Sequence, residues 1–198
     1  MNGWLNTQNW ESGWWGDCHN TYGEETKQLL YVHRLGLRTF HDGKSPYNFD
    51  VRGASVLDIG GGPVSLLLKC HNVRGKVVDP CNYPAWTRER YRLAGMEFEQ
   101  IAGEDIAESG WDECWLYNVL QHVREPARVV ANARRAAKIV RLFEWIDTGT
   151  SDGHPNNLTE AALNEWLGGE GKVEQLTGQN TCVGKCYYGV FKGDAYGV

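Results

Sequence analysis

The sequence Ser55-Val56-Leu57-Asp58-Ile59-Gly60-Gly61-Gly62 decides the fold of this chain. Its first five residues are rich in apolar and β-branched side chains, which is typical of a buried strand, and the glycines end that strand. Pro63 fits the first position of a helix, so we expect a helix over residues 64–71. Glycines at such a turn let the backbone approach a ligand, and a helix N-terminus presents free N–H groups to an anion. The stretch therefore predicts a strand, a ligand-binding turn and a helix.

The alternation of strand and helix continues towards the C-terminus. It predicts strands over residues 76–79, 98–102, 113–117 and 138–146, and helices over residues 84–94 and 126–137. Strands that alternate with helices form a parallel sheet with helices on its faces. After a helix over residues 160–167, strands are expected at 173–176 and 183–191 with no helix between them. The pattern therefore predicts an α/β fold with an antiparallel hairpin at one edge of the sheet.

The N-terminal region has a different character. Four of the nine tryptophans lie in the first fifteen residues, among Gly and Asn and without apolar periodicity, so we expect residues 1–20 to form an irregular arm. Thr21 and Glu24 have the spacing of a capping box, which predicts a helix over residues 22–35 that ends at Gly36. A polar loop over residues 42–46 follows. We interpret the 198 residues as a single domain, with an arm and helix over 1–45 and a core over 46–198.

Composition excludes several classes of protein. The chain has 20 Lys and Arg against 25 Asp and Glu, a net charge of −5, so it lacks the general positive charge that favours nucleic acid or an anionic membrane. No apolar stretch is long enough to span a bilayer. The start at Met1 lacks a secretion signal and the six cysteines are too sparse for a disulfide scaffold, which favours the cytoplasm. Cys182 and Cys186 have no second pair, so no metal site is expected.

An acidic residue ends the second strand of the core. Asp79 lies nineteen residues after Gly60, at a strand end where a carboxylate can accept hydrogen bonds from both hydroxyls of a ribose. Together with the glycine turn, it predicts a nucleoside-binding crevice at the carboxyl ends of the strands. A dinucleotide fingerprint fits imperfectly, because Ser65 stands where its last small residue belongs. An NAD-dependent oxidoreductase therefore stays an alternative.

The ordered set of motifs has a family resemblance. Residues 56–62, Val77-Val78-Asp79, Gly103-Glu104-Asp105, Trp111-Asp112-Glu113 and residues 118–123 together resemble class I S-adenosylmethionine-dependent methyltransferases, over about residues 55–146. The resemblance implies a small stand-alone methyltransferase domain. It also implies a Rossmann-like sheet of seven strands, mostly parallel with an antiparallel last strand and with helices on both faces. The cofactor implied is S-adenosylmethionine.

The resemblance also implies which residues contact the cofactor. Gly60, Gly61 and Gly62 would line its methionine part, supported from below by Asp58, while Asp79 would bind the ribose. Pro80 and Cys81 would border the adenine, Glu104 or Asp105 would meet the adenine amino group, and Asn118 would face the methyl donor. Gln121 and His122 would open towards the substrate.

Methyl transfer requires alignment of the acceptor and, for some acceptors, a base that removes a proton. The candidates near the carboxyl ends of the fourth and fifth core strands are His122, Glu144 and His154. Each histidine has an alternative interpretation: His122 as a packed residue at a helix start, and His154 as a solvent-exposed loop residue.

The arm has two interpretations. By analogy with the family, the arm forms a lid over the site. The candidate residues for the lid are Trp15, Asn20, Tyr22 and Lys27, and Trp145 of the fifth core strand is a further candidate for the substrate pocket. Alternatively the tryptophans cover an apolar surface of the sheet or a dimer contact.

We expect a small-molecule or sugar-like acceptor, methylated at oxygen. A DNA amino group is a poor substrate, because Asn118-Val119-Leu120-Gln121 replaces the Pro-Pro-aromatic motif of the enzymes that methylate such groups. The arginines of the helices over 84–94 and 126–137 are interpreted as solvated surface. The alternatives that remain open are an RNA methyltransferase, the oxidoreductase and a non-catalytic cofactor-binding module.

Overall fold

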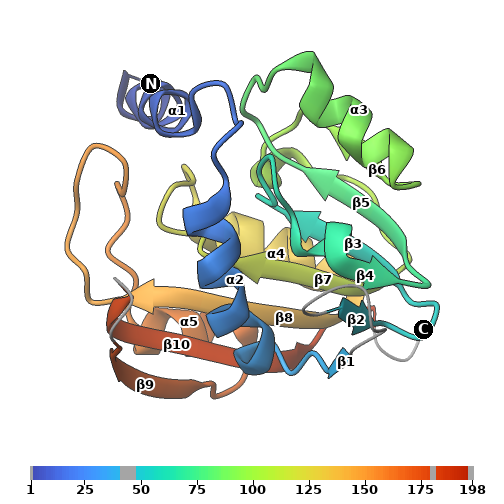
Figure 1. The fold of residues 1–198 in the computed structure, drawn as a ribbon. Helices are drawn as coiled ribbons and strands as arrows, with labels where there is room; N and C mark the ends of the chain where they lie inside the picture. Colours follow the sequence, from blue (N-terminus) through green and yellow to red (C-terminus); the bar gives the residue numbers. More distant parts are fainter. Residues whose placement is uncertain (1, 41–47, 179–181, 196–198) are drawn as a thin grey trace.

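A computed structural model describes residues 2–40, 48–178 and 182–195, and its main feature is a seven-stranded sheet (Figure 1). The strand order is β6-β5-β3-β7-β8-β10-β9. The strands are β3 (Ser55–Ile59), β5 (Arg74–Val78), β6 (Glu97–Glu99), β7 (Trp111–Tyr117), β8 (Ala137–Ile146), β9 (Lys172–Thr177) and β10 (Val183–Lys192). Strand β10 runs antiparallel to both of its neighbours, and the other paired strands are parallel. The expected Rossmann-like sheet with a reversed last strand is therefore confirmed.

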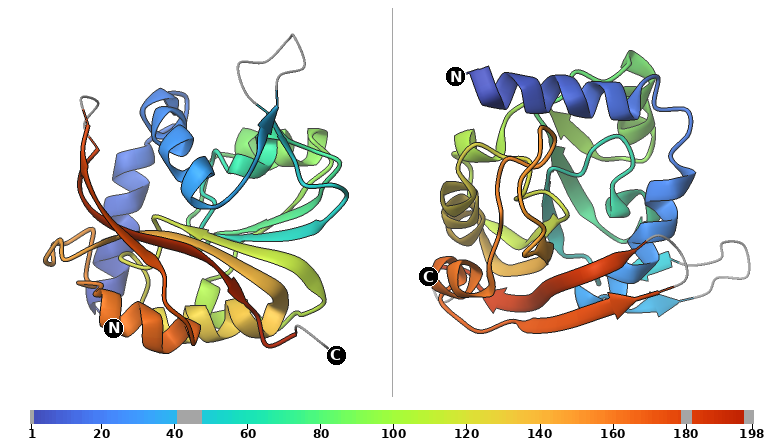
Figure 2. Two further views of the ribbon diagram at one scale, coloured as in Figure 1. Left: turned by 90° about the horizontal axis from the view of Figure 1, so that it is seen from below. Right: turned by 90° about the vertical axis from the view of Figure 1, so that its left-hand side faces the viewer.

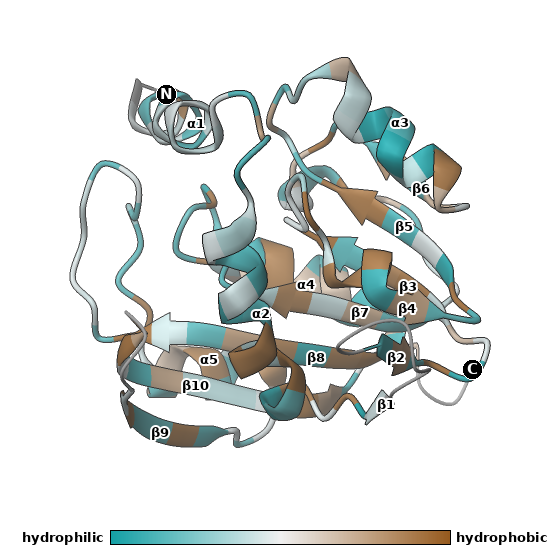
Figure 3. Cartoon of the chain, in the orientation of Figure 1, coloured by the Kyte–Doolittle hydropathy of each residue, from teal (hydrophilic) through white to brown (hydrophobic). Residues whose placement is uncertain are grey.

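Helices cover both faces of this sheet, as expected (Figure 2). On one face lie α4 (Pro126–Ala136) and α5 (Glu160–Leu167), whose apolar residues pack in one cluster with Leu57 and Ile59 of β3. On the other face lie α2 (Tyr22–Arg34) and α3 (Ala85–Leu93), which pack in a second cluster with Val56. Successive side chains of a strand point to opposite faces, so a fully buried strand such as β3 contributes to both clusters. Figure 3 shows the corresponding hydrophobic stretches in β3 and β5.

The prediction of a helix over residues 64–71 is wrong. The chain forms only the 3₁₀ turn η1 (Leu66–Lys69) and then the short strand β4 (Cys70–His71). Ser65 ends the glycine turn and its hydroxyl accepts a hydrogen bond from the Leu67 N–H, which starts a single tight turn. Strand β4 then pairs in parallel with β2 (Asn48–Asp50), which pairs with β1 (Thr39–Phe40) in a small second sheet. These pairings leave no room for a helix.

The prediction of an irregular N-terminal arm is also wrong, because residues 2–15 form the helix α1 (Asn2–Trp15). This helix lies across the end of the sheet at which β3, β5 and β7 terminate (Figures 1 and 2). Helix α2 begins at Tyr22, as expected, but it ends at Arg34, one residue before the expected end, and Thr21 does not cap it with its side chain. The Thr21 hydroxyl instead donates to Glu25 Oε1 at 3.0 Å.

Two expectations concern parts of the chain that are not described. The polar loop over residues 42–46 and the boundary between residues 45 and 46 lie outside the described residues. Within the described residues, no helix has both the length and the apolar character needed to cross a bilayer.

Candidate active site

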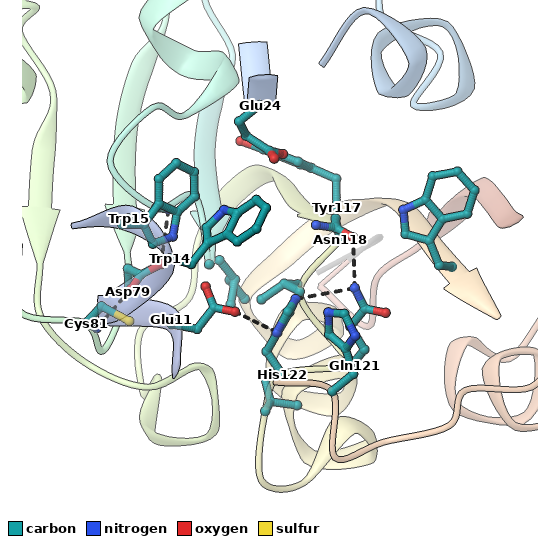
Figure 4. A pocket seen from close by; sticks show the side chains of 18 of the residues that line it. Glu11, Trp14, Trp15, Glu24, Asp79, Cys81, Tyr117, Asn118, Gln121 and His122 are labelled. Atoms are coloured by element: carbon teal, nitrogen blue, oxygen red, sulfur yellow. Dashed lines mark hydrogen bonds and ion pairs between the residues drawn. The ribbon is translucent and has the colours of Figure 1, made fainter. Parts of the chain in front are cut away.

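A cavity of about 540 Å³ lies at the carboxyl ends of the central strands. Its walls come from the ends of β3, β5, β7 and β8 and from the helices α1 and α2 (Figure 4). In parallel α/β sheets, ligands bind outside the carboxyl ends of the strands, where the chain changes direction between neighbours. The cavity occupies this position, and its volume falls in the usual range for small-molecule sites.

The glycine turn forms one wall of the cavity. Gly60, Gly61 and Gly62 line it, whereas Asp58 lies beneath them, fully buried and outside the cavity wall. Asp58 Oδ2 accepts hydrogen bonds from the Ser65 hydroxyl and, at 2.6 Å, from the Tyr117 hydroxyl. The expected supporting role of Asp58 therefore has a geometric basis, but its carboxylate does not reach the cavity.

Asp79 extends this wall at the end of β5. Its Oδ2 accepts from the Gly62 N–H at 3.1 Å, while its Oδ1 accepts from the Cys81 N–H at 2.9 Å and from the Tyr83 hydroxyl at 3.1 Å. Burial raises the pKa of Asp79 to about 6, although these three donors favour the charged form. The group is therefore mainly ionised at neutral pH, as a carboxylate that binds hydroxyls must be.

The structure distinguishes between the two adjacent acids after β6. Glu104 is buried and lines the cavity, and its Oε1 accepts hydrogen bonds from the N–H groups of Arg124 and Glu125. Pro80 and Cys81 also line the cavity. Asp105 is solvent-exposed, pairs with the Arg124 guanidinium at 3.1 Å and does not line the cavity. Glu104 is thus the only one of the two acids that a ligand in the cavity could contact.

The segment after β7 places three polar side chains in the cavity. Asn118 adopts a left-handed backbone conformation with φ of 57°, which turns the chain sharply at the strand end. Gln121 Nε2 donates to Asn118 Oδ1 at 2.9 Å and lies 3.3 Å from His122 Nε2 (Figure 4). An amide N–H₂ is a donor, so this contact places an acceptor lone pair on His122 Nε2.

The other ring nitrogen of His122 faces away from Gln121. Its Nδ1 lies 2.7 Å from the Gly153 carbonyl oxygen and 2.8 Å from Glu11 Oε1 of α1. Both neighbours are acceptors, so the proton of the neutral ring is on Nδ1. His154 also lines the cavity, with its ring centroid 4.7 Å from that of His122. Burial and the neighbouring His122 lower the pKa of His154.

Glu144 is the catalytic candidate that the structure places outside the cavity lining. Its neighbour Trp145 lines the cavity, but Glu144 points to the opposite face of β8 and is fully buried. Its Oε1 accepts from the N–H groups of Val119 (3.0 Å) and Leu120 (2.9 Å). Glu144 therefore fixes the segment that carries Asn118 rather than facing a ligand.

Three of the five lid or pocket candidates line the cavity. Trp15 lies beside Gly62, Lys27 reaches in from α2, and Trp145 lies at the end of β8. Asn20 and Tyr22 do not line it: both are exposed, Tyr22 to 78%. They lie where the chain turns from α1 into α2, so their side chains point to solvent.

Sequence reasoning missed Gln8 and Glu11, two polar residues of α1 that line the cavity. Together with Trp4 and Trp15, which also line it, they recur at spacings of four, three and four residues, which places the four side chains on one face of a helix. This face mixes aromatic with polar residues, so a search for apolar periodicity does not detect it. The 4-3-4 spacing was the signal that could have predicted α1. Figure 3 shows that α1 is mostly white to teal.

Buried acids give this protein an unusual expected dependence of stability on pH. Burial raises the pKa of Asp58 to about 7, of Asp79 to about 6 and of Glu144 to about 7. Between about pH 4 and pH 7 the folded protein therefore holds protons that the unfolded chain releases, so the free energy of unfolding falls as pH rises. Each of these carboxyl groups contributes at most about 1.4 kcal/mol to this fall for every pH unit in that range. We expect a higher Tm at pH 5 than at pH 8 in thermal unfolding.

Glu144→Gln supplies the control for this prediction. The amide keeps an oxygen for the Val119 and Leu120 N–H groups but cannot ionise, so the decrease in Tm between pH 5 and pH 8 should be smaller. A Tm that rises up to pH 8 would contradict the expectation.

No protein-family model matches the sequence, and no curated protein matches it. Several solved structures, however, match this chain in fold. The 1,6-didemethyltoxoflavin-N1-methyltransferase of Burkholderia thailandensis, determined with 1,6-didemethyltoxoflavin and S-adenosylhomocysteine, has a TM-score of 0.63 at 13% identity, over 96% of this chain and 87% of that one.

Two further structures have the same architecture. The magnesium protoporphyrin IX methyltransferase of Synechocystis, with bound S-adenosylmethionine, has a TM-score of 0.56 at 15% identity, over 86% of this chain and 80% of that one. The N-methyltransferase NodS of Bradyrhizobium japonicum, with S-adenosylhomocysteine, has a TM-score of 0.55 at 12% identity, over 86% of each chain. The chain therefore has the fold of the class I S-adenosylmethionine-dependent methyltransferases.

Proposed function

We propose that this chain is an S-adenosylmethionine-dependent methyltransferase that acts on a small-molecule acceptor at oxygen. The observation that carries the proposal is the wall formed by Gly60, Gly61, Gly62 and Asp79. A buried carboxyl group that accepts three hydrogen bonds lies against the glycine turn at the carboxyl end of the sheet, in a cavity large enough for a nucleoside. The similar structures with bound S-adenosylmethionine or S-adenosylhomocysteine support the choice of nucleoside.

The described residues fit this cofactor along the whole wall. Asp79 would accept hydrogen bonds from the ribose hydroxyls, and Pro80 and Cys81 would border the adenine. Glu104 would accept a hydrogen bond from the adenine amino group, since it is the acid that reaches the cavity. The glycine turn would hold the methionine part, with Asn118 and Gln121 at the methyl end. When bound, S-adenosylmethionine supplies a methyl group already activated on a sulfonium.

His122 is our candidate for the base. Its Nε2 carries the lone pair, which here faces the Gln121 amide N–H, and an acceptor hydroxyl that approaches the methyl group would replace this amide contact. A positioned histidine that accepts the hydroxyl proton during transfer accelerates such reactions by about 10²–10⁴-fold. His154 lines the same part of the cavity and would orient the acceptor, because its lowered pKa makes it the weaker base of the two.

The remainder of the cavity indicates the character of the acceptor. Tryptophans of α1 and Trp145 line it, and their faces suit an aromatic ring or the apolar C–H face of a sugar. Among the residues that the structure describes, no arginine lines the cavity, and Lys27 is paired with Glu24 at 3.2 Å. A carboxylate or phosphate on the acceptor would thus lack a free cation, so we propose a neutral acceptor. Helix α1 would act as the lid over it.

Titration with S-adenosylhomocysteine tests this function directly. We expect saturable binding with one site per chain in isothermal titration calorimetry, and no binding of NAD under the same conditions. A ligand that binds only the folded state also raises the Tm in proportion to its saturation, which gives an independent readout. Binding of NAD but not of S-adenosylhomocysteine would overturn the proposal in favour of an oxidoreductase.

A further inference from the structure

We infer that Glu11 of α1 is the positioning residue for His122, so that the base is complete only while α1 lies over the cavity. This inference rests on the proposed function, in which His122 accepts the proton of the acceptor. It assigns α1 a chemical part in the site in addition to covering it.

The contacts of His122 carry the inference. Glu11 Oε1 and His122 Nδ1 are 2.8 Å apart, and each side chain is only 15% exposed (Figure 4). The Gly153 carbonyl oxygen lies on the same nitrogen at 2.7 Å. The Gly153 carbonyl accepts the proton of the neutral ring at Nδ1, and Glu11 Oε1 makes an ion-pair contact with the same nitrogen without a hydrogen bond of its own, so Nε2 is left as the basic atom on the side of Asn118 and Gln121. A carboxylate that orients a histidine and stabilises its charged form is the arrangement that activates a histidine base.

Several groups face His122 and decide how readily it takes a proton. Glu11 approaches from α1, His154 from the loop after β8, and Glu144 from β8 itself. Burial disfavours the imidazolium, but the Glu11 carboxylate, the Gly153 carbonyl and Glu144 outweigh it, so the pKa of His122 is raised. His154 is shifted in the opposite direction. Of the two histidines, His122 is therefore the one prepared to hold a proton.

A role of Glu11 in merely docking α1 is the competing explanation. The helix has other contacts for that purpose: the Thr7 hydroxyl donates to the Asp152 carbonyl at 3.1 Å, the Cys81 thiol contacts Gln8 Oε1 at 3.2 Å, and Arg124 lies 4.7 Å from the ring centroid of Trp4. A largely buried ion pair gains little net stability, because both ions lose their hydration. Its position in the cavity wall thus favours a role in the chemistry.

The test is the pKa of His122 in the full-length chain, measured by NMR titration of the histidine side chains with and without S-adenosylhomocysteine. His122→Gln assigns the signal. In Glu11→Gln the carboxylate is replaced by a neutral amide of the same shape, so we expect the pKa of His122 to fall by about one unit. Asp17→Asn, which removes a charge from an exposed side chain just after α1, should leave it within about 0.3 units.

Two results would overturn the inference. One is an unchanged pKa of His122 in Glu11→Gln, or a decrease of equal size in Asp17→Asn. The other needs no variant: ¹⁵N shifts of the wild-type protein that place the proton of the neutral ring on Nε2. Neither measurement requires turnover. Absence of S-adenosylhomocysteine binding would therefore reject the proposed function, while the coupling of Glu11 to His122 would still be read from the ligand-free titration.

Discussion

Asp79→Ala is expected to weaken binding of S-adenosylhomocysteine by about two to four orders of magnitude. In the proposed complex, Asp79 accepts two hydrogen bonds from the ribose, and a hydrogen bond to a charged group contributes about 1.5–3 kcal/mol. The substitution also removes the acceptor for the N–H groups of Gly62 and Cys81, which align the glycine turn with the end of β5. Isothermal titration calorimetry measures the affinity, and thermal unfolding checks that the fold persists.

Glu99→Gln is the matched control for Asp79→Ala. Glu99 ends the neighbouring strand β6, pairs with Lys76 at 2.6 Å and does not line the cavity. Its substitution removes one carboxylate from the adjacent strand end, so it should change the affinity for S-adenosylhomocysteine by less than about twofold, because Glu99 lies outside the cavity and Lys76 keeps its ion pair with Glu108. If Asp79→Ala bound within fivefold of the wild type, Asp79 would not be the ribose ligand.

Gly60→Ala is expected to lower the free energy of unfolding by about 2–5 kcal/mol. Gly60 has φ of 73°, a left-handed conformation that costs other residues about 1–2 kcal/mol. An added Cβ would also lie 2.9 Å from Val119 Cβ and closer still to one of its methyl groups, and such overpacking costs a further 1–3 kcal/mol or so. For a chain of this size the Tm should fall by roughly 5–15 °C.

Gly95→Ala separates the two causes. Gly95 has nearly the same backbone, with φ of 74°, but nothing lies within 4 Å of an added Cβ. It should therefore show the backbone cost alone, about 1–2 kcal/mol. The excess loss in Gly60→Ala should shrink when Val119→Ala is added, as measured by a double-mutant cycle in denaturant unfolding. Equal losses in Gly60→Ala and Gly95→Ala would show that contact with Val119 has no energetic effect.

Local patterns allowed much of the sheet to be predicted. Local residue preferences predict the strand over residues 55–59, the glycine turn after it and the two final strands that have no helix between them. The reason is that β-branched residues favour strands and glycine tolerates positive φ. Asp79 was found for the same reason: it directly follows a strand whose partner carries the glycine turn. The structure confirms the parallel sheet and the antiparallel hairpin at its edge that these patterns predict.

Neighbouring residues in the chain could not be distinguished in this way. Whether Glu104 or Asp105 lines the cavity depends on which of them meets the N–H groups of the segment after β7. Whether Glu144 or Trp145 lines the cavity depends on the register of β8 against β10, since a shift of one residue would exchange the sheet faces to which the two side chains point.

By itself, the sequence determined that this chain forms a mainly parallel α/β sheet with an antiparallel hairpin at one edge, and that Gly60 and Asp79 lie at the carboxyl ends of neighbouring strands. Only the tertiary structure decided that residues 2–15 form a helix and that its Glu11 lies against His122. The physical reason is the range of the interactions involved. Strand and turn preferences act between adjacent residues, whereas the ion pair of Glu11 with His122 exists only because the sheet brings the N-terminal helix and the end of β7 to the same cavity.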